Sequence, residues 1–289
     1  MVGRAPKSYP RRTSQKRQGL SADWCPTEMT SRPEPVAGLI ALFWAAGAAL
    51  TSCSCRNWWP GHRVGSRISS PKRHIACCTG GVTTRVCIES GTRRVFASAL
   101  DWPGWCRSGR TEEQALETLA TYAARYAPVA ASAGLRFEPE LVEFEVVERA
   151  KGNVTTDVGA PGIISAAEYE PLDATGAADL ASLVAACWPE LDRAARGAPA
   201  ELRKGFRGGG RDRDEIIDHV ANAELAYVRK LGIRLGSDLA ASRAALVTVL
   251  SSPSEGRPLV AKGWPPRYAA RRIAWHVLDH AWEIEDKSQ

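Results

Sequence analysis

The stretch Arg272-Ile-Ala-Trp-His-Val-Leu-Asp-His-Ala-Trp-Glu283 decides how the C-terminal part of this chain folds. His276 and His280 are four residues apart, so in an α-helix both imidazoles project from one face, one turn apart. At helical spacing, the two histidines share one face with three apolar residues: Ile273, His276, Val277, His280 and Ile284. The stretch therefore predicts a helix whose two histidines lie on its apolar face, toward the protein interior.

A segment about 50 residues earlier places a third histidine in a similar setting. Asp212 is a suitable helix N-cap with Glu215 at the reciprocal capping position, and Gly232 ends the segment. His219 falls on the same predicted helical face as Ile216, Val220, Ala223 and Tyr227. Three imidazoles that converge from two helices would offer three nitrogens to a metal ion and leave one position open, as in catalytic metal sites. The alternative is that each histidine satisfies itself by hydrogen bonds in the core.

Two further helical segments complete a predicted antiparallel four-helix bundle over residues 175–289. The first extends from about Ala177 to Arg196, and another extends from near Ser237 to Ser251. The histidine-pair helix follows Pro265-Pro266, where proline suits a first turn, and extends to about Asp286. Short connections between helices of this length favour antiparallel neighbours.

Two carboxylates are candidate catalytic residues of this predicted site. Glu283 lies one turn beyond His280 on the same face, and Glu224 lies on the helix of His219. Either could orient a metal ligand or act as a general base. A solvated carboxylate or an ion pair is the alternative for both. Asp218 and Asp279 flank the histidines and are expected to point away from the interior face.

Residues 85–150 predict a small β-β-(β)-α-β unit, so the expected fold class is α+β. Arg85–Glu89 and Arg94–Leu100 alternate in character around a glycine-bearing turn, which predicts a hairpin. Thr111 and Gln114 form a capping-box pattern ahead of an apolar helical stripe. The alternating stretch Val142–Glu148 predicts the last strand.

Composition divides the chain into further parts. Residues 1–84 carry 12 Lys or Arg and 3 Asp or Glu, whereas residues 85–289 carry 26 and 29, so the basic excess belongs to a tail. A nucleic-acid-binding face would need basic residues on the folded part, and none is expected. Residues 151–174 are rich in Gly, Pro and Ala and predict a linker.

The tail, residues 1–84, is expected to be disordered or to lie upstream of a mis-assigned start. An export signal is the alternative, because Leu50-Thr-Ser-Cys53 resembles a lipoprotein cleavage box after the apolar run Val36–Leu50. That run is too short for a confident membrane span, so no membrane association is expected for the folded body. The body has three dispersed cysteines and no CxxC, which is typical of a reducing compartment and predicts a cytoplasmic protein.

The N-terminal unit resembles the HicB-like family of small antitoxin domains. The resembling residues are Phe96-Ala-Ser-Ala-Leu-Asp-Trp-Pro-Gly-Trp105 and Gly109-Arg-Thr-Glu-Glu-Gln-Ala-Leu116. They span turn and cap positions and imply a fold more than a function. Trp102 and Trp105 are expected to pack a loop onto the sheet, with a ligand pocket as the alternative.

The C-terminal region resembles the DinB-like superfamily of metal-binding four-helix bundles, which includes bacterial thiol S-transferases and mycothiol-dependent isomerases. Ile217-Asp-His-Val-Ala-Asn-Ala-Glu-Leu-Ala-Tyr227 and Ile273-Ala-Trp-His-Val-Leu-Asp-His280 carry the resemblance. It implies Zn2+ or Ni2+ on His219, His276 and His280, with water in the open position. It also implies a low-molecular-weight thiol such as mycothiol as a second cofactor.

Two functions follow as hypotheses of different classes. The first is a metal-dependent transferase that activates a small thiol, or water in a hydrolase variant, for attack on a small electrophilic substrate. The second is a non-catalytic binding or regulatory protein built from the two modules. The metal, the thiol, the electrophile and the oligomeric state stay open, with a homodimer as one option for the last.

Overall fold

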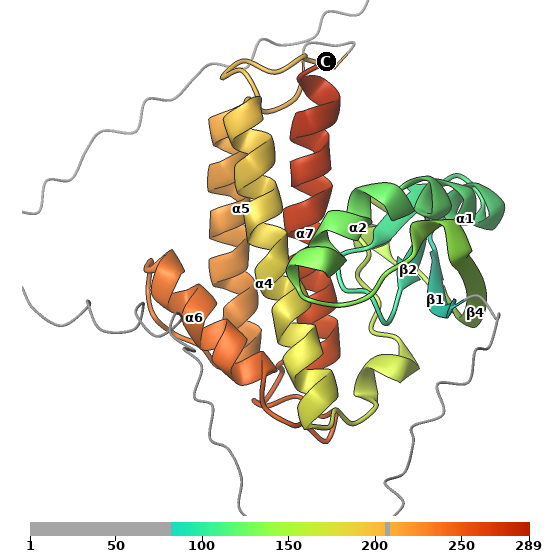
Figure 1. The fold of residues 1–289 in the computed structure, drawn as a ribbon, viewed down its shortest axis with the longest axis vertical. Helices are drawn as coiled ribbons and strands as arrows, with labels where there is room; N and C mark the ends of the chain where they lie inside the picture. The colour runs from blue at the N-terminus through green and yellow to red at the C-terminus, as the bar shows by residue number, and fades with distance from the viewer. Residues whose placement is uncertain (1–81, 206–208) are drawn as a thin grey trace, which may run out of the picture. The chain divides into compact units, whose positions relative to one another are not determined.

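The computed structural model of the protein describes residues 82–205 and 209–289 (Figure 1). Over these residues the fold is mixed α+β, as predicted, with a four-stranded sheet and seven α-helices. The predictions for residues 1–81, whether a disordered tail, a mis-assigned start or an export signal, lie outside the described residues. Within the described ranges, no helix combines the length and the apolar character needed to cross a lipid bilayer.

The sheet contains β1 (Val82–Ser90), β2 (Val95–Ala99), β3 (Cys106–Gly109) and β4 (Val142–Lys151) in the order β3-β2-β1-β4. The antiparallel pair β1–β2 confirms the predicted hairpin, β3 pairs antiparallel with β2, and β4 pairs parallel with β1. The predicted end of the tail at residue 84 is wrong. Residues 82–84 belong to β1 because they pair with residues 142–144 of β4, and a partner so distant in sequence leaves no local pattern.

Helices α1 (Glu112–Thr121) and α2 (Ala123–Ser132) follow β3, and the short 3-10 helix η1 (Pro139–Leu141) leads into β4. As predicted, Thr111 caps α1, since its hydroxyl accepts a hydrogen bond from Gln114 N at 3.3 Å. The sequence did not predict α2 as a separate helix, which begins after a break at Tyr122. α1 packs against β2 and β3, and α2 packs against α4.

The two tryptophans of the β2–β3 loop belong to this packing. Trp105 is completely buried, and its indole N–H donates to the Leu119 carbonyl of α1 at 2.9 Å. Its ring stacks on Tyr126 at a centroid distance of 5.8 Å, and Trp102 packs edge-on against Tyr126 at 6.1 Å. The tryptophans therefore hold the loop against the helices, as expected.

Residues 151–174, predicted as a linker, contain α3 (Val154–Asp157) and the 3-10 helix η2 (Ala166–Tyr169). The buried carboxylate of Glu89 on β1 accepts backbone N–H groups from Gly162 and Ile163, both at 3.0 Å. Glu168 forms a buried ion pair with Arg271 of α7 at 2.5 Å. These contacts fix the segment between the sheet and α7.

The C-terminal region contains α4 (Ala174–Gly197), α5 (Arg213–Val228), η3 (Arg229–Leu231), α6 (Leu239–Leu250) and α7 (Pro266–Lys287). These bounds lie within about three residues of the predicted ones. Gly232 ends η3 with φ +87°, a left-handed conformation that suits glycine, as its predicted stop role requires. α4 and α5 each pack against both α6 and α7.

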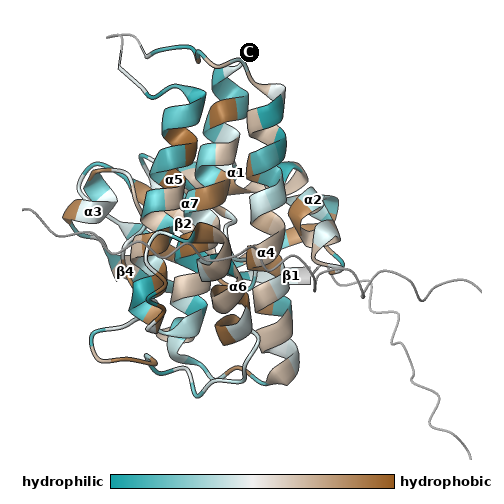
Figure 2. Ribbon diagram, turned by 90° about the vertical axis from the view of Figure 1, so that its left-hand side faces the viewer, coloured by the Kyte–Doolittle hydropathy of each residue, from teal (hydrophilic) through white to brown (hydrophobic). Residues whose placement is uncertain are grey.

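Helix α7 lies at the centre, with α4 and α5 on one side and the sheet on the other (Figure 1). Trp275 meets Phe96 of β2 edge-on at 6.3 Å, and the loop before β3 approaches α7 at Gly104. A Cβ at Gly104, whose φ is +94°, would lie 2.7 Å from Leu278 Cδ1, so only glycine fits there. Figure 2 shows polar and apolar residues alternating along the same helices, as expected for helices with one buried face.

Candidate metal centre

His219 from α5 and His276 and His280 from α7 lie together in the structure. Each ring offers one nitrogen to a group whose members all lie within 4.8 Å of one another, and His219 Nε2 is 3.2 Å from His276 Nε2. The rings that the sequence predicted to converge therefore do so, in an arrangement that could hold a metal ion. The residues on both sides of His219 and His276 explain this, since Ile216, Val220, Ile273 and Val277 are fully buried where α5 packs on α7.

Burial keeps two of the three rings neutral. His276 is only 6% exposed, and burial lowers its pKa to about 2, with the nearby imidazoles acting in the same direction. The pKa of His219 is also lowered, first by burial and then by the positive charge of Arg211. A neutral imidazole keeps a lone pair, and this is the form that binds a metal ion. At neutral pH, His219 and His276 can therefore each offer a nitrogen lone pair to a metal ion.

Glu283 fixes the third ring. Its Oε2 lies 2.6 Å from Nδ1 of His280, and Lys287 Nζ lies 2.5 Å from its Oε1. These partners, the hydrogen bond with His280 foremost, lower the pKa of Glu283 to about 2, so the group is an ionised acceptor. In the neutral ring this carboxylate selects the tautomer with the proton on Nδ1, which leaves the lone pair on Nε2. In metal sites, the imidazole nitrogen that does not bind the metal commonly donates a hydrogen bond to a carboxylate, which orients the ring.

The three histidines could hold a metal ion. Two imidazole nitrogens bound tetrahedrally to one ion at about 2.0–2.1 Å would lie about 3.3 Å apart, close to the 3.2 Å between His219 and His276. His276 Nδ1 is buried and has no hydrogen-bond partner among the described residues. Its ring is instead packed between Tyr227 and Trp275, at centroid distances of 5.7 and 5.9 Å. Packing, not a second hydrogen bond, sets the orientation of His276.

Glu224, the other carboxylate predicted for the site, belongs to a different cluster. It is 1% exposed and accepts hydrogen bonds from Trp188 Nε1 of α4 and Arg243 of α6, both at 2.5 Å. Five residues along a helix correspond to a rotation of about 140°, which turns Glu224 away from the face of His219. The structure gives it partners on α4 and α6 and, among the described hydrogen bonds, none with the histidines.

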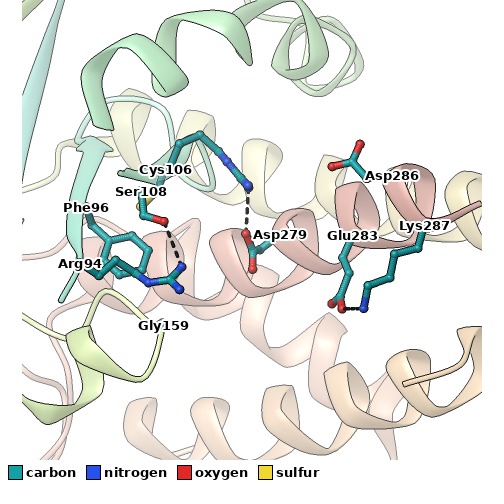
Figure 3. A pocket seen from close by; sticks show the side chains of 10 residues that line it. Arg94, Phe96, Cys106, Ser108, Gly159, Asp279, Glu283, Asp286 and Lys287 are labelled. Carbon is teal, nitrogen blue, oxygen red and sulfur yellow. Dashed lines mark hydrogen bonds and ion pairs between the residues drawn. The ribbon is translucent and has the colours of Figure 1, made fainter. Parts of the chain in front are cut away.

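A cavity of about 400 Å3 lies beside Glu283, between the sheet and α7 (Figure 3). Arg107 of β3 reaches across it to Asp279, whose carboxylate it binds at 2.8 Å. Asp279 pairs with Arg107 in this cavity and is only partly exposed, so it does not point into solvent from the outer face of α7. Asp218 is exposed, as expected. Sequence reasoning missed Arg107 and the cavity, because the pairing joins residues 172 positions apart and no local pattern marks it.

Comparison of the chain with protein-family models, with curated proteins and with solved structures gave no match.

Proposed function

We propose that residues 175–289 form a DinB-like four-helix bundle and that the protein is a metal-dependent transferase acting with a small thiol. In this proposal His219, His276 and His280 hold Zn2+ or Ni2+. One observation carries it: three imidazole nitrogens lie within 4.8 Å of one another, with a carboxylate on the far side of one ring. Isolated core histidines have no need of this combination, whereas a metal site uses both parts.

The ion, held by neutral ligands, would keep its charge and lower the pKa of a thiol or water molecule that reaches it, which supplies a nucleophile. The protein's own residues prepare the site. Glu283 holds the proton of His280 on Nδ1, and burial keeps His276 unprotonated. In the overall transfer, the thiol sulfur forms a bond to an electrophilic carbon. The leaving group departs with its electron pair, and the thiol proton is released with it.

The proposal includes a small-molecule substrate, no nucleic-acid partner and a cytoplasmic location. Cys87, Cys106 and Cys187 are buried free thiols in the structure. Burial raises the pKa of all three thiols, to about 11 for Cys87 and about 12 for Cys106, so none is a nucleophile at neutral pH. The reactive sulfur must therefore come from a separate molecule or from outside the described residues.

Metal analysis of the purified full-length protein tests the proposal. After exposure to Zn2+ or Ni2+ we expect about one ion per chain in the wild type and below about a tenth of an ion in His276→Ala. Asp218→Ala is the matched control, since it removes an exposed side chain beside His219 and should leave the metal content unchanged. A folded wild type that takes up neither ion would contradict the proposal and favour a non-catalytic binding protein.

A conjugation assay then tests the chemistry. The metal-loaded protein is mixed with a cellular thiol and an aryl halide, and the coloured thioether is followed by absorbance. Several cellular thiols are compared, mycothiol among them. We expect at least one of them to react faster with the wild type than with His276→Ala. Hydrolysis of an aryl ester without thiol transfer would instead favour the hydrolase variant.

A further inference from the structure

Helix α7 carries two neighbouring buried arginines that differ in their partners. Arg271 is 4% exposed and forms a buried ion pair with Glu168 at 2.5 Å. Arg272 is 9% exposed, and no carboxylate among the described residues pairs with it. It donates instead to the Pro161 carbonyl at 2.7 Å and to the Tyr227 hydroxyl at 3.4 Å, which are both neutral. Because a buried charge without a counter-ion is costly, the position of Arg272 needs a cause other than packing.

Two aromatic rings connect Arg272 to the candidate metal centre. The guanidinium carbon of Arg272 lies 4.8 Å from the ring centroid of Trp275 and 5.5 Å from that of Tyr227. The same two rings pack against His276, at centroid distances of 5.9 and 5.7 Å. Cation–π contacts of this kind hold a guanidinium in place but do not neutralise its charge. Arg272 and His276 are therefore neighbours that contact the same two rings.

The helical spacing places Arg272 and the histidines on facing sides of α5 and α7. Arg272 is four residues before His276 on α7, which is one helical turn, or about 5.4 Å along the axis. His219, Ala223 and Tyr227 have the same spacing on α5, and all three are partly exposed. Solvent therefore reaches the α5 face between His219 and Tyr227, where the intervening side chain is only a methyl group.

The charge on this side of the centre is positive. Burial is the main cause of the low pKa of His276, and the charges of Arg272 and Arg211 act in the same direction. Glu283, the carboxylate of the centre, is already bonded to His280. A divalent ion held by three neutral imidazoles would add further positive charge. The arrangement therefore favours a ligand with a negative charge.

The hydrogen-bond donors that remain on Arg272 identify the kind of anion. A guanidinium has five N–H groups and two of those on Arg272 have acceptors, so three are left. The Tyr227 hydroxyl accepts from Arg272 and donates to none of the described residues, so its hydrogen is also available. A carboxylate matches this set, because it carries one negative charge and accepts arginine N–H groups in pairs.

We propose that Arg272 is a specificity-determining residue of this centre and binds the carboxylate of a small acidic substrate. With its carboxylate on Arg272, such a molecule reaches the three imidazoles when its reactive carbon lies two or three bonds further on, since one helical turn is about 5.4 Å. Arg272 thus selects acidic substrates over neutral ones. The inference rests on the proposed function for the reaction at the metal, whereas binding of the carboxylate depends on Arg272.

The probes 4-fluorobenzoate and 4-fluorobenzamide test this proposal, because they share one ring and differ in the negative charge. Fluorine NMR titration measures their dissociation constants with the full-length, metal-free protein, in which no ion competes for the carboxylate. We expect the wild type to bind the acid about tenfold more tightly than the amide, as hydrogen bonds between charged groups predict. Arg272→Met should remove this preference. The exposed Arg229→Met is the matched control for loss of one positive charge and should keep it.

Two further measurements locate the carboxylate and guard against a folding defect. Loading the wild type with Zn2+ should strengthen binding of the acid, because the ion adds positive charge nearby. Arg272→Lys keeps the charge but not the planar fork, and it should keep less than about half of the preference while circular dichroism shows the wild-type fold.

The outcomes separate the two proposals. A preference that depends on Arg272 in a protein that takes up no metal would support the carboxylate site and contradict the metal function. Equal binding of both probes, no binding of either, or an equal loss of preference in Arg229→Met would overturn the carboxylate site. A full preference in Arg272→Lys would do the same, and Zn2+ uptake without any effect on the acid would place the carboxylate away from the centre and so contradict the inference.

Discussion

Glu283 and Glu224 each follow a histidine on a helix, but at different spacings, and they belong to different parts of the molecule. Glu283 is three residues after His280 and bonds its Nδ1. Glu224 is five residues after His219 and bonds Trp188 and Arg243 instead. A spacing of three residues keeps two side chains on one helical face, and a spacing of five does not.

The two carboxylates therefore have different roles, one in helix packing and the other in orienting an imidazole. Glu224 is almost completely buried and joins α5 to α4 and α6, so it stabilises the helix packing. Glu283 is partly exposed, borders the cavity and orients an imidazole. Substitutions at these two positions should therefore separate stability from metal binding.

Glu224→Ala should give the largest effect, and it should be on stability. The change leaves the Trp188 N–H and the Arg243 guanidinium without their buried acceptor, which destabilises the fold by about 3 kcal/mol. Urea denaturation followed by circular dichroism measures the loss, and Glu224→Gln should recover part of it because the amide oxygen still accepts. A lower metal affinity in folded Glu224→Ala would place this residue in the metal centre and break the comparison.

Glu283→Ala should affect the metal before the fold. Losing the acceptor on Nδ1 frees the His280 ring, and supports of this kind contribute about tenfold to a hundredfold in metal affinity. Competition with a coloured chelator measures the affinity, and urea denaturation of the metal-free protein serves as the control. If Glu283→Ala instead unfolds the protein as readily as Glu224→Ala does, the two carboxylates have the same structural role.

Acid should lower the free energy of unfolding through protonation of His276 in the unfolded chain. Burial depresses the folded-state pKa of His276 from 6.5 to about 2, so below pH 6.5 the unfolded chain binds a proton that the folded chain does not. Stability then falls as the pH falls, by about 1.2 kcal/mol at pH 5.5 relative to pH 7 for this one group. Urea denaturation of metal-free protein across this range measures the loss. His276→Gln should flatten the dependence; an unchanged slope would show that His276 is not the group responsible.

Local sequence patterns were sufficient to predict α1 and α4–α7 and the convergence of the three imidazoles, but not α2 or α3. Asp212, Gly232 and Pro266 mark helix ends through capping and backbone chemistry that acts within a few residues. His276 and His280 lie at i,i+4 spacing on an apolar helix face, which packs toward the interior. In the sequence of residues 175–289, the other apolar helix face that includes a histidine is that of His219. The convergence therefore followed from helical geometry.

The cavity could not be predicted in this way. Its walls meet because α7 packs against the sheet, which depends on close fits such as Gly104 against Leu278. Arg107 and Asp279 find each other only after that packing, and the parallel pairing of β1 with β4 is equally non-local. The partners of Glu224 could not be predicted for the same reason, because they lie on two other helices, α4 and α6.

Lys287→Ala should give the smallest effect and sharpen the account of Glu283. Lys287 binds Oε1 of Glu283, whereas His280 is bonded by Oε2, so the imidazole keeps its acceptor when the lysine is removed. A partly exposed i,i+4 ion pair contributes about 0.5 kcal/mol, and we expect a change in metal affinity below about twofold. The exposed Lys151→Ala is the control for loss of one charge. A tenfold loss of affinity in Lys287→Ala alone would mean that the lysine, by holding the carboxylate in place, sets the orientation of His280.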